Sequence, residues 1–159
     1  MKPEQEELLD GQNEPPIKNS FWTQALLVST GQIPQQMTHS QVQQISPAAL
    51  AYLGDAIYEL YVRMCYLMPL QRPDTYHRLV VAQVRAEKQA LHLRSLIPHL
   101  KEIELDIVRR GRNAAAGRSK RVDPEIYQQA TSLETLIGYL YLTDFQRLTE
   151  LLQTLELEK

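Results

Sequence analysis

The chain has 159 residues, of which 43% are hydrophobic, and a formal net charge of −2, which suits one globular domain with its own core. No apolar run approaches the roughly 20 residues that a membrane-spanning helix needs, and the acidic first 20 residues are unlike a secretory or transit peptide. Cys65 is the only cysteine, so no disulfide can form within the chain, and we expect a cytoplasmic protein with no membrane partner.

The chain begins with a segment that lacks the pattern of a packed helix. Residues 1–40 are rich in Gln, Glu and Pro and poor in periodic apolar residues, which is typical of a disordered or loosely docked tail. We therefore expect the folded domain over residues 41–159.

The first strong helix signal is Ser46-Pro47, a capping serine followed by proline at the first helical position. Apolar residues then recur at spacings of three and four and predict one buried stripe: Leu50, Leu53, Ile57, Leu60, Met64 and Leu67. Pro69 ends this helix.

A second helical segment is expected from Asp74 to Leu96, where Pro98 breaks it. A helix over 101–110 follows, and then residues 109–121, which read RRGRNAAAGRSKR and which we interpret as a basic loop.

Two more helices complete the chain. Asp123-Pro124 repeats the pattern of a cap followed by proline, and Thr143 or Asp144 caps the last helix. No segment alternates with period two, so the predicted fold is all-α, a compact helical bundle.

The basic stretch is the main charge asymmetry of the chain. Six of the 17 basic residues fall in it with no acid among them: Arg109, Arg110, Arg112, Arg118, Lys120 and Arg121. An acidic protein with one concentrated basic segment is typical of a polyanion binder, and Asn113 could add a polar contact. The alternative interpretation is an ordinary solvated loop.

Two helices carry a glycine and an acid in their interior. Gly54 precedes Asp55, and Glu134 lies one turn before Gly138. A mid-helix glycine costs about 1 kcal/mol relative to alanine and is usually compensated by close approach of another backbone. We expect the two helices to cross at these glycines, which would bring the two carboxylates together and favour Mg²⁺ between them. The alternative is two surface acids and two packing glycines.

The side of the first helix that carries Asp55 is partly apolar, with Ala48, Ala51, Tyr58 and Val62. Two accounts of what covers it stay open: a two-fold contact with a second copy, or burial inside one chain. Glu59, one turn from Asp55, could orient water at a metal or form a salt bridge, and the four histidines are too scattered to form a metal site.

These motifs resemble those of the ribonuclease III family. The run ALAYLGDAIYELYVR, from residue 49, is similar to the family's signature helix, and ATSLETLIGYLYL to its second motif. The run RRGRNA resembles the matching segment of the short Mini-ribonucleases III, which lack a double-stranded-RNA-binding domain. The resemblance covers about residues 45–155 and implies that Asp55 and Glu134 are the catalytic, metal-binding acids.

The resemblance further implies a homodimeric, Mg²⁺-dependent endoribonuclease that cuts double-stranded RNA, with a role in trimming 23S ribosomal RNA precursor ends. The family's additional acids are replaced here by Ala48, Ala51 and Thr131, which leaves the number of bound ions open. A catalytically silent RNA-binding member of the fold is the alternative. A helix-turn-helix DNA binder is disfavoured because the basic residues are not spread along a recognition helix.

Overall fold

The computed structural model describes residues 36–118 and 121–158. Within these ranges the secondary structure is helical and contains no strand, which confirms the predicted all-α class. Its elements are α2 (His39–Val42), α3 (Pro47–Leu67), α4 (Pro73–Val84), α5 (Ala86–Leu96), the 3₁₀ turn η1 (Ile97–His99), α6 (Glu102–Ala115), α7 (Pro124–Thr143) and α8 (Phe145–Gln153). In the part of the chain that is described, no helix has the length and hydropathy of a membrane span.

Three of the predicted helix starts are confirmed by their caps. The side chain of Ser46 accepts from the backbone N–H of Ala49, and Asp123 accepts from the first N–H groups of α7. Asp144 caps α8 by accepting from the N–H of Arg147. Local side-chain bonds of this kind satisfy donors that have no partner inside the helix.

The predicted tail, residues 1–40, lies outside the described residues up to residue 35. Beyond that point, the N–H of Met37 donates to the carbonyl of Leu142 at 2.8 Å, and Thr38 caps α2.

Two predicted boundaries are wrong. The segment from Asp74 to Leu96 is two helices, because Arg85 takes an extended conformation with ψ near 150° between α4 and α5. The basic stretch is not a loop from residue 109: α6 continues to Ala115, so Arg109, Arg110, Arg112 and Asn113 are helical. Gly111 lies against α7, where an added Cβ would stand 2.5 Å from Oγ1 of Thr135, and this packing carries the helix past the glycine.

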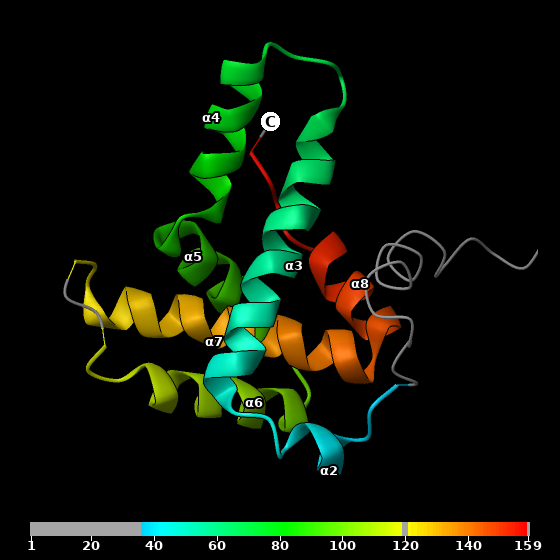
Figure 1. Ribbon diagram of the computed structural model, residues 1–159, viewed down its shortest axis with the longest axis vertical. Helices are drawn as coiled ribbons and strands as arrows, with labels where there is room; N and C mark the ends of the chain where they lie inside the picture. Colours follow the sequence, from blue (N-terminus) through cyan, green and yellow to red (C-terminus); the bar gives the residue numbers. More distant parts are fainter. Residues whose placement is uncertain (1–35, 119–120, 159) are drawn as a thin grey trace, which may run out of the picture. The chain divides into compact units, whose positions relative to one another are not determined.

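The centre of the bundle is α7, which packs against α3, α5 and α6 (Figure 1). Nine of its residues are buried, including Leu133, Leu136 and Leu140. A helix that is buried on most sides carries apolar residues around most of its circumference. The helices α3, α5 and α6 are therefore all positioned by their packing against α7.

The buried side of α3 differs from the predicted stripe. Leu50 and Ile57 are buried, but Leu60 and Met64 are 37% and 42% exposed. Tyr58 and Val62 are fully buried instead, so the face that needed a cover is largely covered inside one chain. The burial of Tyr58 leaves its hydroxyl satisfied, because the hydroxyl bonds to Nδ1 of His92 at 2.7 Å and to the carbonyl of Gln83 at 3.2 Å.

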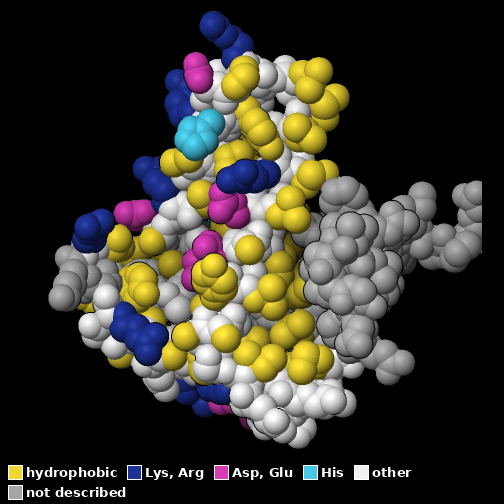
Figure 2. Space-filling model, viewed as in Figure 1, with side chains coloured by type: hydrophobic (Ala, Val, Ile, Leu, Met, Phe, Trp, Pro, Cys, Tyr) yellow, Lys and Arg dark blue, Asp and Glu magenta, His cyan; other side chains and the backbone are white. Residues whose placement is uncertain are grey.

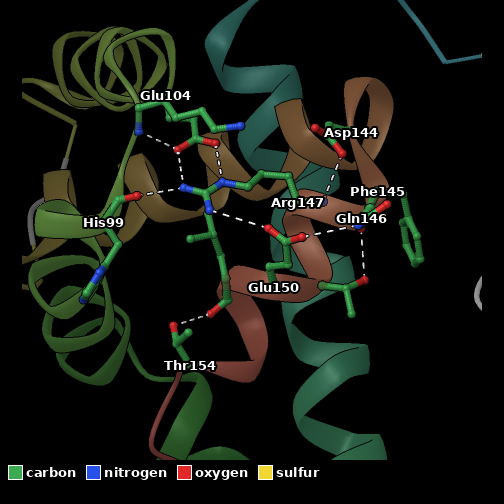
Figure 3. Close-up of polar contacts among 11 residues, drawn as sticks. His99, Glu104, Asp144, Phe145, Gln146, Arg147, Glu150 and Thr154 are labelled. Carbon is green, nitrogen blue, oxygen red and sulfur yellow. Dashed lines mark hydrogen bonds and ion pairs between the residues drawn. The ribbon is translucent and has the colours of Figure 1, made fainter.

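A buried ion pair fixes α6 against α8 (Figure 3). Glu104 is 1% exposed and accepts from Nε and Nη2 of Arg147 at 2.8 and 3.0 Å, while Nη2 also donates to the carbonyl of His99. Burial alone would raise the pKa of Glu104, but the bonds from Arg147 and from the N–H of Lys101 hold it below its usual range. A pair with this many hydrogen bonds keeps a buried charge satisfied and sets where the basic part of α6 lies.

Candidate active site

The crossing of α3 and α7 at two glycines, expected from the sequence, is confirmed. A Cβ on Gly54 would stand 1.7 Å from the carbonyl oxygen of Glu134, and a Cβ on Gly138 would stand 2.1 Å from the carbonyl oxygen of Leu50. No side chain fits at either distance, so the two backbones touch here because both residues are glycine.

The crossing places the two predicted acids in one cleft. Asp55 follows Gly54 directly, and both Asp55 and Glu134 line a cleft of about 360 Å³. Burial and then the nearby charge of Asp55 raise the pKa of Glu134 to about 7. Burial and the charge of Glu59 raise the pKa of Asp55 as well. Repulsion of this kind is relieved when a cation binds between the carboxylates.

The remaining walls of the cleft are mostly small or aromatic. Three lining residues are Ala48, Ala51 and Thr131, the positions where the family resemblance leads one to expect further acids. Consistent with their loss, residues 36–118 and 121–158 contain no cluster of three or more His, Cys, Asp or Glu side chains arranged to hold a metal. The anionic donors of the cleft are therefore two carboxylates.

This donor set fits a hard divalent cation. Mg²⁺ accepts one or two carboxylates and keeps several of its waters, so the two acids suffice. A third oxygen supports the fit: Oε1 of Gln89 is buried without a hydrogen-bond partner among the described residues, and Gln89 lines the same cleft. Asp55 and Glu134 are the residues that would hold the ion.

Gln89 is a site residue that the sequence interpretation missed. Its signal was a polar residue at an apolar spacing, because Gln89, Leu93 and Leu96 share one buried side of α5. The sequence alone does not distinguish a buried glutamine that serves a site from one that only packs in the core. The distinction depends on which residues of other helices face it.

The residues predicted to bind a polyanion fall into two groups along the chain. On α6, Arg109 pairs with Asp106 at 2.9 Å, Arg110 donates to the carbonyl of Gln43 at 3.4 Å, and Arg112 lies 3.8 Å from Glu125. Asn113 is exposed on the same helix.

The second group follows α6 in the chain. Arg118 lines the cleft itself, together with the two acids, and Arg121 is exposed. Lys120 lies outside the described residues. Figure 2 shows acidic side chains over the middle of α3 with basic side chains above them and to their left, an arrangement suited to a cation and a polyanion bound together.

The secondary candidates have ordinary roles. Glu59 accepts from Nε of Arg63 at 3.1 Å, so it forms the predicted alternative, a salt bridge within α3. His39 bonds to the hydroxyl of Tyr139 and His92 to that of Tyr58. No histidine lines the cleft in the part of the chain that the structure describes.

Comparison with known proteins finds a family match that includes every residue lining the cleft. The Ribonuclease III domain family matches residues 48–144. A Mini-ribonuclease 3 of Synechocystis sp. is 61% identical over 116 residues, covering 73% of this chain and 81% of that protein. One of Synechococcus sp. is 55% identical over 121 residues, covering 76% and 88%. The crystal structure of protein FN1578 from Fusobacterium nucleatum has a TM-score of 0.59 and 35% identity, covering 64% of this chain and 82% of that one.

Proposed function

The chain belongs to the ribonuclease III family, and we propose that this endoribonuclease cuts double-stranded RNA with Mg²⁺ held by Asp55 and Glu134. The observation that carries the proposal is the shared cleft, in which burial and the charge of Asp55 raise the pKa of Glu134 to about 7. A divalent ion is the natural partner for two such carboxylates.

The chain's own residues do three things in this proposal. Asp55 and Glu134 hold and orient the ion, which when bound supplies Lewis acidity to activate water and polarise the scissile phosphate. Arg118, in the wall of the cleft, contacts a phosphate oxygen beside the cleavage point. The close crossing of α3 and α7 at Gly54 keeps the two acids fixed relative to each other.

The binding surface for the duplex is the exposed part of α6 and the segment after it. Arg109, Arg110, Arg112 and Asn113, with Arg118, Lys120 and Arg121, contact the RNA backbone. Duplex RNA is recognised mostly by shape and by phosphate and 2′-OH contacts, for which flexible cationic side chains are suited. Affinity that rests on phosphates falls steeply with salt.

The proposed enzyme is a homodimer, but its two copies do not meet at the side of α3 that carries Asp55, which the sequence analysis considered. The C-terminal half of α3 exposes Leu60, Met64 and Leu67, by 37%, 42% and 43%, and the following residues Met68 and Leu70 by 67% and 81%. Hydrophobic side chains gather over this end of α3 (Figure 2). A self-complementary contact there would bury them and give one site for each strand of the duplex.

The substrate in this proposal is the 23S ribosomal RNA precursor, trimmed at its ends in the cytoplasm. Support comes from the motif resemblance to the Mini-ribonucleases III and from relatives that carry that name. A catalytically silent RNA-binding role is the second candidate, favoured by the loss of acids at Ala48, Ala51 and Thr131. The proximity of Asp55 and Glu134 favours the enzyme, because a silent copy gains nothing from two repelling carboxylates.

One cleavage assay separates the two candidates. The wild-type chain, Asp55→Asn and Glu134→Gln are each incubated with a long RNA duplex, with Mg²⁺ or with EDTA. We expect fragments only from the wild type with Mg²⁺. Asp74→Asn, a change of an exposed acid in the first turn of α4, is the matched control and should cut normally. Binding of the duplex without cutting by the wild type would favour the silent role.

A further inference from the structure

One buried polar atom of a residue that lines the cleft has no hydrogen-bond partner among the described residues. Oε1 of Gln89 is buried, the residue is 3% exposed, and no hydrogen-bond donor reaches this atom from the described residues. A buried oxygen without a donor costs free energy, so an unpaired oxygen on the wall of a cleft points to a ligand that supplies the missing contact.

The orientation of the Gln89 amide is fixed by its other end. Nε2 donates to the carbonyl of Val84, the last residue of α4, at 3.0 Å. An amide turned by 180° would place two oxygens against each other there. A side-chain hydrogen bond from Gln89 also offsets part of the rise in the pKa of Glu134, so the NH₂ group serves both Val84 and Glu134 and leaves Oε1 free.

The interruption of the helix between α4 and α5 makes this placement possible. Arg85 is extended, so α5 starts in a new direction and presents Gln89 in its first turn, at the wall shared with Asp55 and Glu134. Asp55, Gln89 and Glu134 come from three different helices, α3, α5 and α7, and all three residues line one cleft.

We propose that Gln89 is a positioning residue of the metal site, whose Oε1 accepts a hydrogen bond from the hydration shell of the ion held by Asp55 and Glu134. The inference rests on the proposed function. Mg²⁺ keeps several waters when it binds to few carboxylates, and neutral oxygens beyond the direct ligands orient those waters. The further acids of the family pattern are absent here, at Ala48, Ala51 and Thr131, and the neutral amide of Gln89 takes over part of their role in holding the hydrated ion.

The test measures ion binding without RNA. Metal-free wild type and Gln89→Met are titrated with MgCl₂ by calorimetry, and Tm is recorded in EDTA and in Mg²⁺. Methionine keeps the volume but removes both the Oε1 acceptor and the Nε2 donor to Val84. The Kd for Mg²⁺ should rise about 10-fold, and Tm in EDTA records separately what the loss of the donor costs. Gln89→Glu keeps an acceptor oxygen but turns a second oxygen toward the carbonyl of Val84. It should therefore lower Tm in EDTA and still bind Mg²⁺ at least as tightly as the wild type.

Gln83 offers a matched control. It is 2% exposed and also has a buried Oε1 without a partner among the described residues, but it does not line the cleft. Gln83→Met should leave the Kd for Mg²⁺ unchanged. An unchanged Kd in Gln89→Met, with binding lost in Asp55→Asn, would overturn the role of Gln89 and leave the nuclease proposal intact. Absence of Mg²⁺ binding by the wild type would overturn both.

Discussion

Gly54 lies in direct contact with the backbone of Glu134, whose carbonyl oxygen occupies the place where a side chain on Gly54 would begin. The residue that follows Gly54 is Asp55, so one contact sets both how closely α3 and α7 approach and how near their acids lie. The packing of the bundle and the geometry of the cleft therefore depend on the same pair of residues.

The first prediction concerns Gly54→Ala. Alanine favours a helix by about 1 kcal/mol over glycine, yet its methyl group would stand 1.7 Å from the Glu134 carbonyl oxygen and push the helices apart. We expect the free energy of unfolding to fall by about 2–3 kcal/mol, measured by urea denaturation. Ala56→Gly, at an exposed position of α3, is the control and should cost only about 1 kcal/mol. A Gly54→Ala protein more stable than the wild type would contradict the crossing.

The second prediction concerns pH. The pKa of Glu134 is raised to about 7 in the folded protein, above its ordinary value of 4.5. The folded state therefore holds this proton more tightly than the unfolded state, and the stability from this group is lost as pH rises from about 4.5 through 7. Glu134→Gln has no such loss. In EDTA, its stability relative to the wild type should grow by about 2–3 kcal/mol across this range.

Urea denaturation at a series of pH values measures this difference, and Mg²⁺ should reduce it by favouring the ionised Glu134 of the wild type. Glu87→Gln changes an exposed glutamate of α5 and should show no comparable trend. If the difference in unfolding free energy between Glu134→Gln and the wild type does not change with pH, burial and the charge of Asp55 do not raise the pKa of Glu134.

The third prediction concerns the basic part of α6. Replacing Arg109, Arg110 and Arg112 by alanine should abolish measurable binding to an RNA duplex at physiological salt while the helical circular dichroism spectrum is retained. The residual binding at low salt should depend less steeply on salt, because fewer counterions are released. Arg72, Arg78 and Arg94, all exposed, provide an equal change of charge elsewhere and should leave the affinity far less affected. Unchanged affinity in the α6 variant would remove this helix from the binding surface.

The fourth prediction concerns assembly. Met64→Glu should convert a dimer to a monomer in sedimentation velocity, since it places a charge in the exposed apolar face of α3. Leu91→Glu, at a position of α5 that is 50% exposed, should remain dimeric. A wild-type chain that sediments as a monomer at all concentrations would contradict the homodimer.

Features with local causes could be predicted from the sequence. Ser46, Asp123 and Asp144 cap helices through bonds to residues two or three positions away, so their signals are complete in the chain itself. The glycine crossing was also predictable, because a mid-helix glycine is costly unless another backbone approaches it.

Features that depend on contacts between distant parts of the chain could not be predicted from the sequence. Apolar periodicity shows that α3 has an apolar side but cannot choose between two such sides. The buried side is the one that packs against the other helices, and there Tyr58 meets His92 of α5. The continuation of α6 past Gly111 likewise depends on Thr135 of α7. Gln89 lies at the cleft on a helix that starts anew after the extended Arg85, and the sequence interpretation had placed both helices in one.

The most direct test of the central claim, one divalent ion shared by Asp55 and Glu134, is a crystal structure of the wild-type chain soaked in MnCl₂. Mn²⁺ is a stand-in for Mg²⁺ whose anomalous scattering locates it without ambiguity. We expect an anomalous peak within coordination distance of carboxylate oxygens of both residues, at about 2.0–2.3 Å, and no peak in Asp55→Asn treated in the same way. A cleft without a peak at saturating Mn²⁺, or a peak bound by neither carboxylate, would contradict it.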